Sequence, residues 1–108
     1  MKTNFKEYLK KKKAQSSIDK IAKQYAGKKI ILCGAGLFAG DLIRNYNLSK
    51  LNVLGVVDDT FVDSPEGKYY EYEKFIPTDL LDIDFDLLLI IVYDDTIVKA
   101  FLRNDLLK

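Results

Sequence analysis

Histidine is absent from this chain, and cysteine occurs only once, at Cys33. Without histidine, a Ser/His/Asp triad, a histidine-ligated zinc ion and a histidine general base are all excluded. A single cysteine excludes an internal disulfide framework and a cysteine-rich metal site. Because no histidine is present to activate its thiol, we interpret Cys33 as a small core residue rather than a nucleophile.

Long hydrophobic runs are also lacking. The longest wholly apolar run is 87–92, far below the roughly 20 residues that a bilayer crossing needs, and no signal peptide opens the chain. We therefore expect no membrane segment and a cytoplasmic location. With 108 residues, of which 48% are hydrophobic, the chain suits one packed domain with no separate catalytic domain beside it.

Charge is divided unevenly along the chain. Residues 1–57 hold twelve Lys/Arg and three Asp/Glu, a net charge of +9, whereas residues 58–108 hold five and thirteen, a net charge of −8. We interpret the lysines of 1–27 as the solvated side of a helical preface. The alternative is a basic arm, Lys10–Lys13 with Lys2 and Lys6, that meets nucleic acid or an acidic partner. Nucleic acid is not the expected partner, because no aromatic interleaving or nucleic-acid motif accompanies these lysines.

The preface 1–27 has helical periodicity. Its apolar residues share one stripe, and Gly27 is placed to end the helix in a left-handed turn; the stripe consists of Ile18, Ile21, Ala22 and Tyr25. Asn4 with Glu7, and Ser16 with Asp19, have capping-box spacing. We predict two short helices or one interrupted helix.

Residues 28–108 alternate between strand and helix patterns. The apolar run 30–33 predicts a buried strand, and 53–57 predicts a second strand after a helix; the inward side of that helix holds Ala39, Leu42, Ile43 and Tyr46. The segment 69–73 alternates aromatic and acidic residues and predicts a weak edge strand. A helical turn at 79–82 precedes a central strand at 87–92.

The end of the chain predicts a last helix. It would be capped by residues 94–96 and would face inward through Ile97, Val98, Phe101, Leu102 and Leu106. The expected fold is thus α/β, a Rossmann-like parallel sheet in the order 2-1-3, with 30–33 in the middle and 53–57 and 87–92 beside it. Since no later strand would pair with 87–92, we expect a homo-oligomer or an additional domain to cover that edge.

The segment between the first strand and the following helix carries the strongest motif. Gly34-Ala35-Gly36-Leu37-Phe38-Ala39 fits G-x-G-x-x-G/A in the strand-turn-helix context that the motif requires. Such a turn lets backbone N–H groups and the helix dipole reach a phosphate. The alternative is a glycine turn in an unliganded α/β protein. We predict nucleotide binding through the backbone of Gly34, Ala35, Gly36, Leu37 and Phe38.

Acidic residues follow the second strand. Asp58 lies 22 residues beyond Gly36, near the spacing of about 20 at which this fold places a ribose-binding acid, and Asp59 is placed almost as well. Their alternative role is that of an acidic loop at a strand end. With carboxylates and no arginine there, NADP is disfavoured relative to NAD. Tyr70 and Lys74 form Tyr-x-x-x-Lys, which we interpret as coincidental because the segment is predicted to be extended.

Four segments together resemble a known family pattern: Lys28 to Gly36, Val53 to Asp59, Phe75-Ile76-Pro77 and Asp86 to Val92. The pattern resembles the Rossmann-like nucleotide-binding modules of bacterial glycan biosynthesis, found in acetyltransferases acting on UDP-linked sugars and in polysaccharide-biosynthesis dehydratases and epimerases. The resemblance covers about residues 20–107. It implies that the glycine turn contacts a phosphate and that Asp58 or Asp59 lies near the nucleoside.

Catalysis does not follow from this resemblance. The related acetyltransferases carry a histidine and a hexapeptide repeat domain, and the dehydratases carry their Tyr-x-x-x-Lys pair further along; this chain has none of these features. We therefore expect a non-catalytic or regulatory domain that binds a nucleotide, either a UDP-sugar or NAD. The alternatives are a fragment of an NAD-dependent oxidoreductase or epimerase, and an interaction or scaffold domain that uses the basic N-terminal helix.

Overall fold

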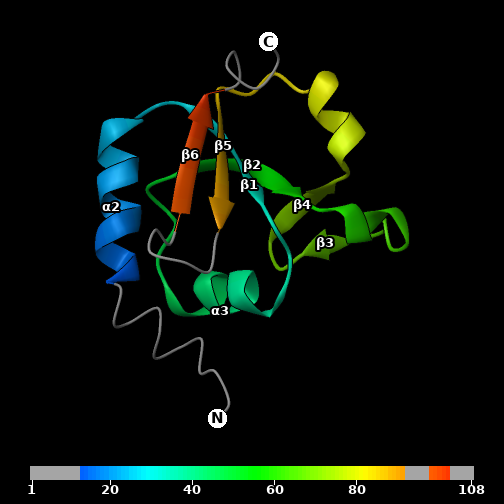
Figure 1. Cartoon of the computed structure of the whole chain (residues 1–108), viewed down its shortest axis with the longest axis horizontal. Helices are drawn as coiled ribbons and strands as arrows, with labels where there is room; N and C mark the ends of the chain where they lie inside the picture. Colours follow the sequence, from blue (N-terminus) through cyan, green and yellow to red (C-terminus); the bar gives the residue numbers. More distant parts are fainter. Residues whose placement is uncertain (1–12, 92–97, 103–108) are drawn as a thin grey trace.

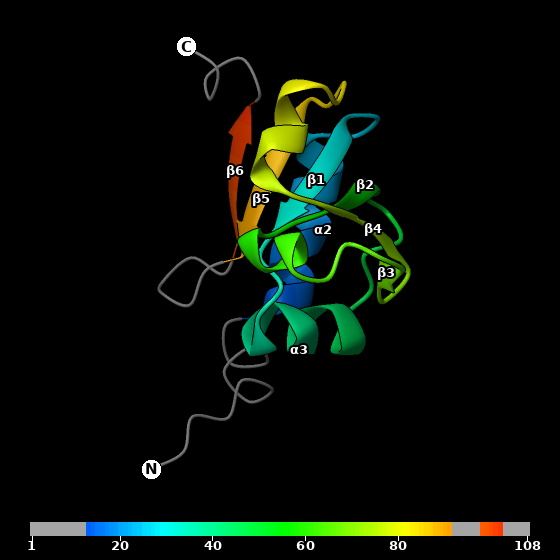
Figure 2. The ribbon, with the colours of Figure 1, turned by 90° about the vertical axis from the view of Figure 1, so that its right-hand side faces the viewer.

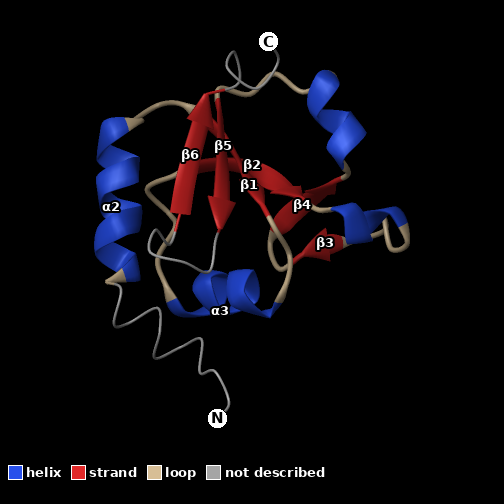
Figure 3. Cartoon of the chain, viewed as in Figure 1, coloured by secondary structure: helices blue, strands red, loops and turns tan. Residues whose placement is uncertain are grey.

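The computed structural model describes residues 13–91 and 98–102 (Figures 1 and 3). Its α-helices are α2 (Ala14–Gln24) and α3 (Leu37–Asn45), and its 3-10 helices are η1 (Asp59–Val62) and η2 (Pro77–Leu81). The strands are β1 (Lys29–Cys33), β2 (Asn52–Val57), β3 (Lys68–Tyr69), β4 (Tyr72–Phe75), β5 (Leu87–Ile91) and β6 (Val98–Leu102). The predicted alternation of strands and helices is confirmed as far as β5.

The strands form one mixed sheet in the order β3-β4-β2-β1-β5-β6. β1 pairs in parallel with β2 on one side and with β5 on the other, as predicted for these three strands, but the full strand order differs from 2-1-3 because further strands lie on both sides. β4 extends the parallel part beside β2, and β3 folds back antiparallel on β4. The predicted edge strand is therefore a short hairpin.

Residues 98–102 form a strand, not the predicted helix. β6 runs antiparallel to β5, with Leu87 opposite Leu102 and Ile91 opposite Val98. The open edge that led us to expect a homo-oligomer or an additional domain is thus covered by the same chain, and that premise was wrong. A strand here satisfies the backbone groups along β5, which a helix would have left unpaired. The proposed capping residues 94–96, with Ile97 and Leu106, lie outside the described residues.

The start of α2 also differs from the prediction. The helix begins at Ala14, so Ser16 lies inside the first turn instead of capping it. Its inward stripe is confirmed, because Ala14, Ile18 and Ala22 are buried, and Gly27 takes the left-handed φ of 79° after the helix ends. Residues 1–12 of the preface, including the lysines at 2, 6 and 10–12, lie outside the described residues.

The two α-helices contribute to the same side of the sheet. Side chains from α2 and α3 pack with alternate residues of β1 and β5 in the larger core; its largest fully buried members are Ile18, Ile30, Leu42, Val56, Leu87 and Leu89. The opposite face holds a smaller core around Ile31 and Leu88, covered in part by Leu80 of η2. Figure 2 shows α2 behind the sheet and the yellow 3-10 helix η2 in front of it.

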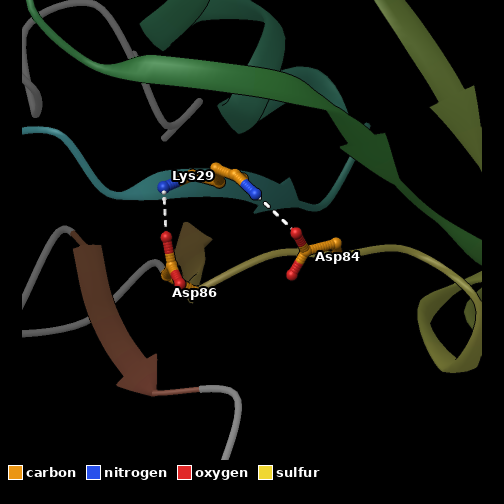
Figure 4. Close-up of polar contacts among 3 residues, drawn as sticks. All are labelled: Lys29, Asp84 and Asp86. Atoms are coloured by element: carbon orange, nitrogen blue, oxygen red, sulfur yellow. Dashed lines mark hydrogen bonds and ion pairs between the residues drawn. The ribbon is translucent and has the colours of Figure 1, made fainter.

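A polar latch joins β1 to the segment leading into β5, at the amino ends of these strands (Figure 4). The Lys29 backbone N–H donates to Asp86 Oδ2 at 2.8 Å, and the Asp86 N–H donates to the Lys29 carbonyl at 2.8 Å. The Lys29 ammonium contacts Asp84 Oδ2 at 2.5 Å, and this hydrogen bond raises the pKa of Lys29. These contacts fix the β1–β5 register at the end of the sheet away from α3.

Candidate functional site

The glycine turn lies where β1 ends and α3 begins. Gly34 has a φ of 117°, a region that L side chains rarely adopt, and its N–H donates to the Val57 carbonyl at 3.0 Å. Gly36 is the N-cap of α3 and is exposed, and no side chain caps the helix there. The predicted strand-turn-helix context of the motif is confirmed. Leu37 and Phe38 are the first two residues of α3.

Asp58 holds this turn in place. Its Oδ2 accepts a hydrogen bond from the Ala35 N–H at 2.8 Å, while Oδ1 accepts from the N–H and the hydroxyl of Thr60 at 2.9 and 2.6 Å. Burial pushes the pKa of Asp58 upward, but the hydrogen bonds from Thr60 and Ala35 outweigh it and leave the pKa below its ordinary 3.8. The carboxylate that we predicted at a ribose is therefore also a structural clamp between β2 and the turn.

Removing this clamp should destabilise the domain. We expect Asp58→Ala to lower the free energy of unfolding by about 1–3 kcal/mol, because the part-buried Ala35 N–H loses its charged acceptor. Urea unfolding measures the change, and Asp59→Ala is the matched control because Asp59 is exposed and its side chain makes no hydrogen bond or ion pair with another described residue. Equal losses in the two variants would contradict the clamp.

The clamp also predicts how the free energy of unfolding changes at acidic pH. A carboxyl whose pKa is lowered by folding contributes stability above its unfolded pKa, and this contribution is lost as the pH falls below about 4 and through the lowered folded value. The difference in stability between wild type and Asp58→Ala should therefore shrink as urea unfolding is repeated from about pH 7 down to about pH 3. A difference that does not depend on pH would count against an ionised clamp.

Two hollows flank the glycine turn. The first, about 380 Å³, lies between α3 and the β3–β4 hairpin and is lined by Ala35, Gly36, Gly40, Arg44, Tyr69 and Tyr70. The second, about 270 Å³, lies on the side of η2 and is lined by Cys33, Val57, Asp58, Asp59, Pro77, Leu80 and Leu88. A further hollow of about 300 Å³ lies around the carboxyl end of α3 and does not reach the turn. Of the predicted site residues, Ala35 and Gly36 line the first hollow, and Asp58 and Asp59 line the second.

The two hollows differ in charge. The hollow on the η2 side contains two carboxylates and no basic residue among those that line it. Burial, followed by the charges of Asp58 and Asp59, raises the pKa of the Cys33 thiol. A thiol in this environment stays protonated, as expected for the core role predicted for Cys33. The hollow between α3 and the hairpin instead contains the guanidinium of Arg44.

Arg44, Tyr69 and Tyr70 were not identified from the sequence as site residues. Arg44 lies eight residues beyond Gly36 on α3, and the tyrosines come from the hairpin that folds back toward that helix. Lys74, the other member of the Tyr-x-x-x-Lys pattern, donates to the carbonyls of Ser64 and Glu66 at 2.8 and 3.0 Å. Its ammonium therefore binds the backbone of the loop before β3.

Within residues 13–91 and 98–102, no cluster of acidic or cysteine side chains is arranged to hold a metal ion. None of the helices in that part of the chain has the length and apolar character needed to cross a bilayer.

Comparison with protein-family models, curated proteins and solved structures found no match for the chain. The resemblance to glycan-biosynthesis modules stays a prediction.

Proposed function

We propose that this domain binds a nucleotide or a nucleotide-sugar at the glycine turn, without catalysing a reaction by itself. One observation carries the proposal: an exposed, side-chain-free Gly36 is the N-cap of a nine-residue helix and lines a hollow at the carboxyl ends of the parallel strands, where Asp58 and Asp59 line a second hollow. Ligands of open α/β sheets bind at this edge, in the crevice outside the strand ends. Figures 1 and 2 both place α3 at that end.

The phosphate position follows from which donors are already in use. The N–H groups of Gly34 and Ala35 are occupied by Val57 and Asp58. The backbone N–H groups of Gly36 and of the first turn of α3 are the remaining donors, and α3 has no acidic residue in its first turn. A phosphate there gains the positive end of the helix dipole. The contact is thus assigned to Gly36, Leu37 and Phe38, with Gly34 and Ala35 shaping the turn.

The sugar position follows from the hollow on the η2 side. Asp58 retains acceptor capacity beyond its three hydrogen bonds, because an ionised carboxylate offers about four lone-pair sites. Asp59 is exposed beside it at the start of η1. Two carboxylates suit the hydroxyl groups of a ribose and repel a 2'-phosphate. The proposal therefore favours UDP, UDP-sugars and NAD over NADP.

A thermal-shift panel tests the proposal directly. The panel contains UDP, UDP-N-acetylglucosamine, NAD, NADP, S-adenosylmethionine and coenzyme A. A ligand present at 100 times its dissociation constant stabilises by about 2.7 kcal/mol, which raises the melting temperature of a domain of this size by about 10 °C or more. We expect a UDP compound or NAD to give such a shift and NADP to give less. No shift with any of the six compounds would contradict nucleotide binding.

A further inference from the structure

Two tyrosines of the β3–β4 hairpin line the hollow between α3 and the hairpin. Neither has a role in the nucleotide binding proposed above. Tyr69 and Tyr70 stand edge to face, with ring centroids 4.8 Å apart and planes at 81°. Tyr69 also packs on Phe61, at a centroid distance of 5.6 Å, so its ring contacts two aromatic neighbours. Tyr70 sits at the hairpin turn with a φ of 55°, and its side chain is 48% exposed. A large, exposed aromatic residue is uncommon in this conformation.

Both tyrosine hydroxyls converge on one point above α3. A Cβ atom added to Gly40 would lie 3.0 Å from the Tyr70 hydroxyl oxygen and 3.5 Å from that of Tyr69. The absence of a side chain at Gly40 is therefore what lets the hydroxyls approach the helix. Neither hydroxyl makes a hydrogen bond to another residue in the part of the chain that the structure describes. Two hydroxyl groups that can donate thus face the same hollow without an acceptor among the described residues.

Arg44 supplies a positive charge at the same place. Its side chain is 53% exposed, and its Nη2 donates to Asp41 Oδ1 one turn earlier on α3. The hydrogen bond to Asp41, and then the nearby Tyr70 hydroxyl, raise the pKa of Arg44. A guanidinium has five N–H donors, so the bond to Asp41 leaves most of them for another acceptor. Among the described residues, Arg44 is the side chain that engages the Asp41 carboxylate.

We propose that Arg44, Tyr69 and Tyr70 form a subsite for a phosphate group. Arg44 offers only donors, each tyrosine hydroxyl can also donate toward the hollow, and Asp41, which is not among the lining residues, offsets part of the Arg44 charge. An oxyanion with several acceptor atoms satisfies such a set, whereas a neutral apolar group would leave the hydroxyls unpaired. The subsite rests on the proposed function for its identity as part of a nucleotide site, because the same hollow is lined by Gly36.

The spacing along α3 indicates which phosphate would lie here. Gly36 and Arg44 are eight residues apart, which corresponds to about 12 Å of helix. Because helical side chains lean toward the N-terminus, an extended Arg44 side chain covers part of this distance. The tyrosine hydroxyls lie over Gly40, only four residues from Gly36. The subsite thus fits a phosphate directly linked to one held at the start of α3, as in a diphosphate ligand.

The experiment uses inorganic pyrophosphate and UDP as probes, followed by NMR on the full chain. The chain contains only two arginines, so the Arg44 Nε–H signal is assigned by its loss in Arg44→Gln. We expect pyrophosphate to shift this signal saturably and Arg44→Gln to weaken pyrophosphate binding about tenfold or more. Tyr70→Phe keeps the ring and removes only the hydroxyl, so a smaller loss, about threefold to tenfold, is expected. Dispersed amide spectra establish that both variants fold.

Lys20→Gln is the matched control, because it removes one positive charge from an exposed position on α2. Equal weakening by Lys20→Gln and Arg44→Gln would show general charge attraction and would overturn the subsite. Absence of any saturable shift with pyrophosphate or UDP would also overturn it. Nucleotide binding that is lost in Gly36→Val and unchanged in Arg44→Gln and Tyr70→Phe would leave the proposed function standing without the subsite. Arg44-dependent binding of pyrophosphate, with no nucleotide bound, would retain the subsite and remove the proposed function.

Discussion

Gly55→Ala is expected to lower the free energy of unfolding by about 3 kcal/mol, with a melting temperature about 12 °C lower or more. Gly55 is buried in β2 opposite Glu73 of β4. An added Cβ would lie 2.4 Å from Phe75 Cε2 and 2.7 Å from the Glu73 carbonyl oxygen. Because the second contact is with backbone, the clash cannot be relieved by rotating a side chain, and β4 must move away from β2.

Gly36→Ala is the matched control for this prediction. A Cβ at Gly36 meets nothing within 4 Å, and the residue has a φ of −85° that alanine adopts freely. The Gly36→Ala substitution should lower the free energy of unfolding by no more than about 1 kcal/mol, which is the usual loss from a poorer N-cap. Urea unfolding of the two variants gives the comparison. Similar stabilities would contradict the close approach of β2 and β4.

Gly36→Val is expected to abolish nucleotide binding while the domain stays folded. The branched side chain would project from an exposed position at the start of α3, where the phosphate is proposed to approach the backbone. Since the added atoms meet no protein neighbour at Cβ, the loss should appear in affinity and not in the fold. Calorimetric titration with the best ligand of the thermal-shift panel measures it, and unchanged affinity would remove the turn from the proposal.

Gly34→Val is the contrasting variant. Gly34 has a φ of 117°, so a valine there is strained whatever space surrounds it. We expect a loss of about 1–3 kcal/mol of stability in addition to any loss of binding. The pair of variants thus separates the two reasons for glycine in this motif. Gly34 is required by the backbone conformation, and Gly36 is proposed to be required by the ligand.

The parts of the fold that depend on local pattern were predictable from the sequence. The run 30–33 and the two glycines after it predict the strand and the turn because burial and φ preference act on neighbouring residues. The strand 98–102 was missed because its apolar residues also suit one side of a short helix. What decides between the two is the unpaired edge of β5, a tertiary feature that the segment's own residues do not encode.

The candidate site was likewise predictable only where it depends on local sequence spacing. The glycine turn and the acids after β2 could be recognised from spacing, since a β-α-β unit brings these positions together by its topology. Arg44, Tyr69 and Tyr70 could not, because their meeting depends on the hairpin folding against α3. The hairpin turn itself gives little signal, since Tyr70 takes a left-handed conformation usually occupied by glycine or asparagine.

Amide chemical-shift mapping with UDP, compared between wild type and Gly36→Val, tests the central claim most directly. The account predicts that UDP shifts the amide signals of Ala35, Gly36 and Asp58 in the wild type and leaves that of Lys29, at the opposite end of β1, in place. In Gly36→Val the same shifts should vanish while the spectrum stays dispersed. Shifts centred on Lys29, or equal shifts in both proteins, would contradict a nucleotide site at the glycine turn.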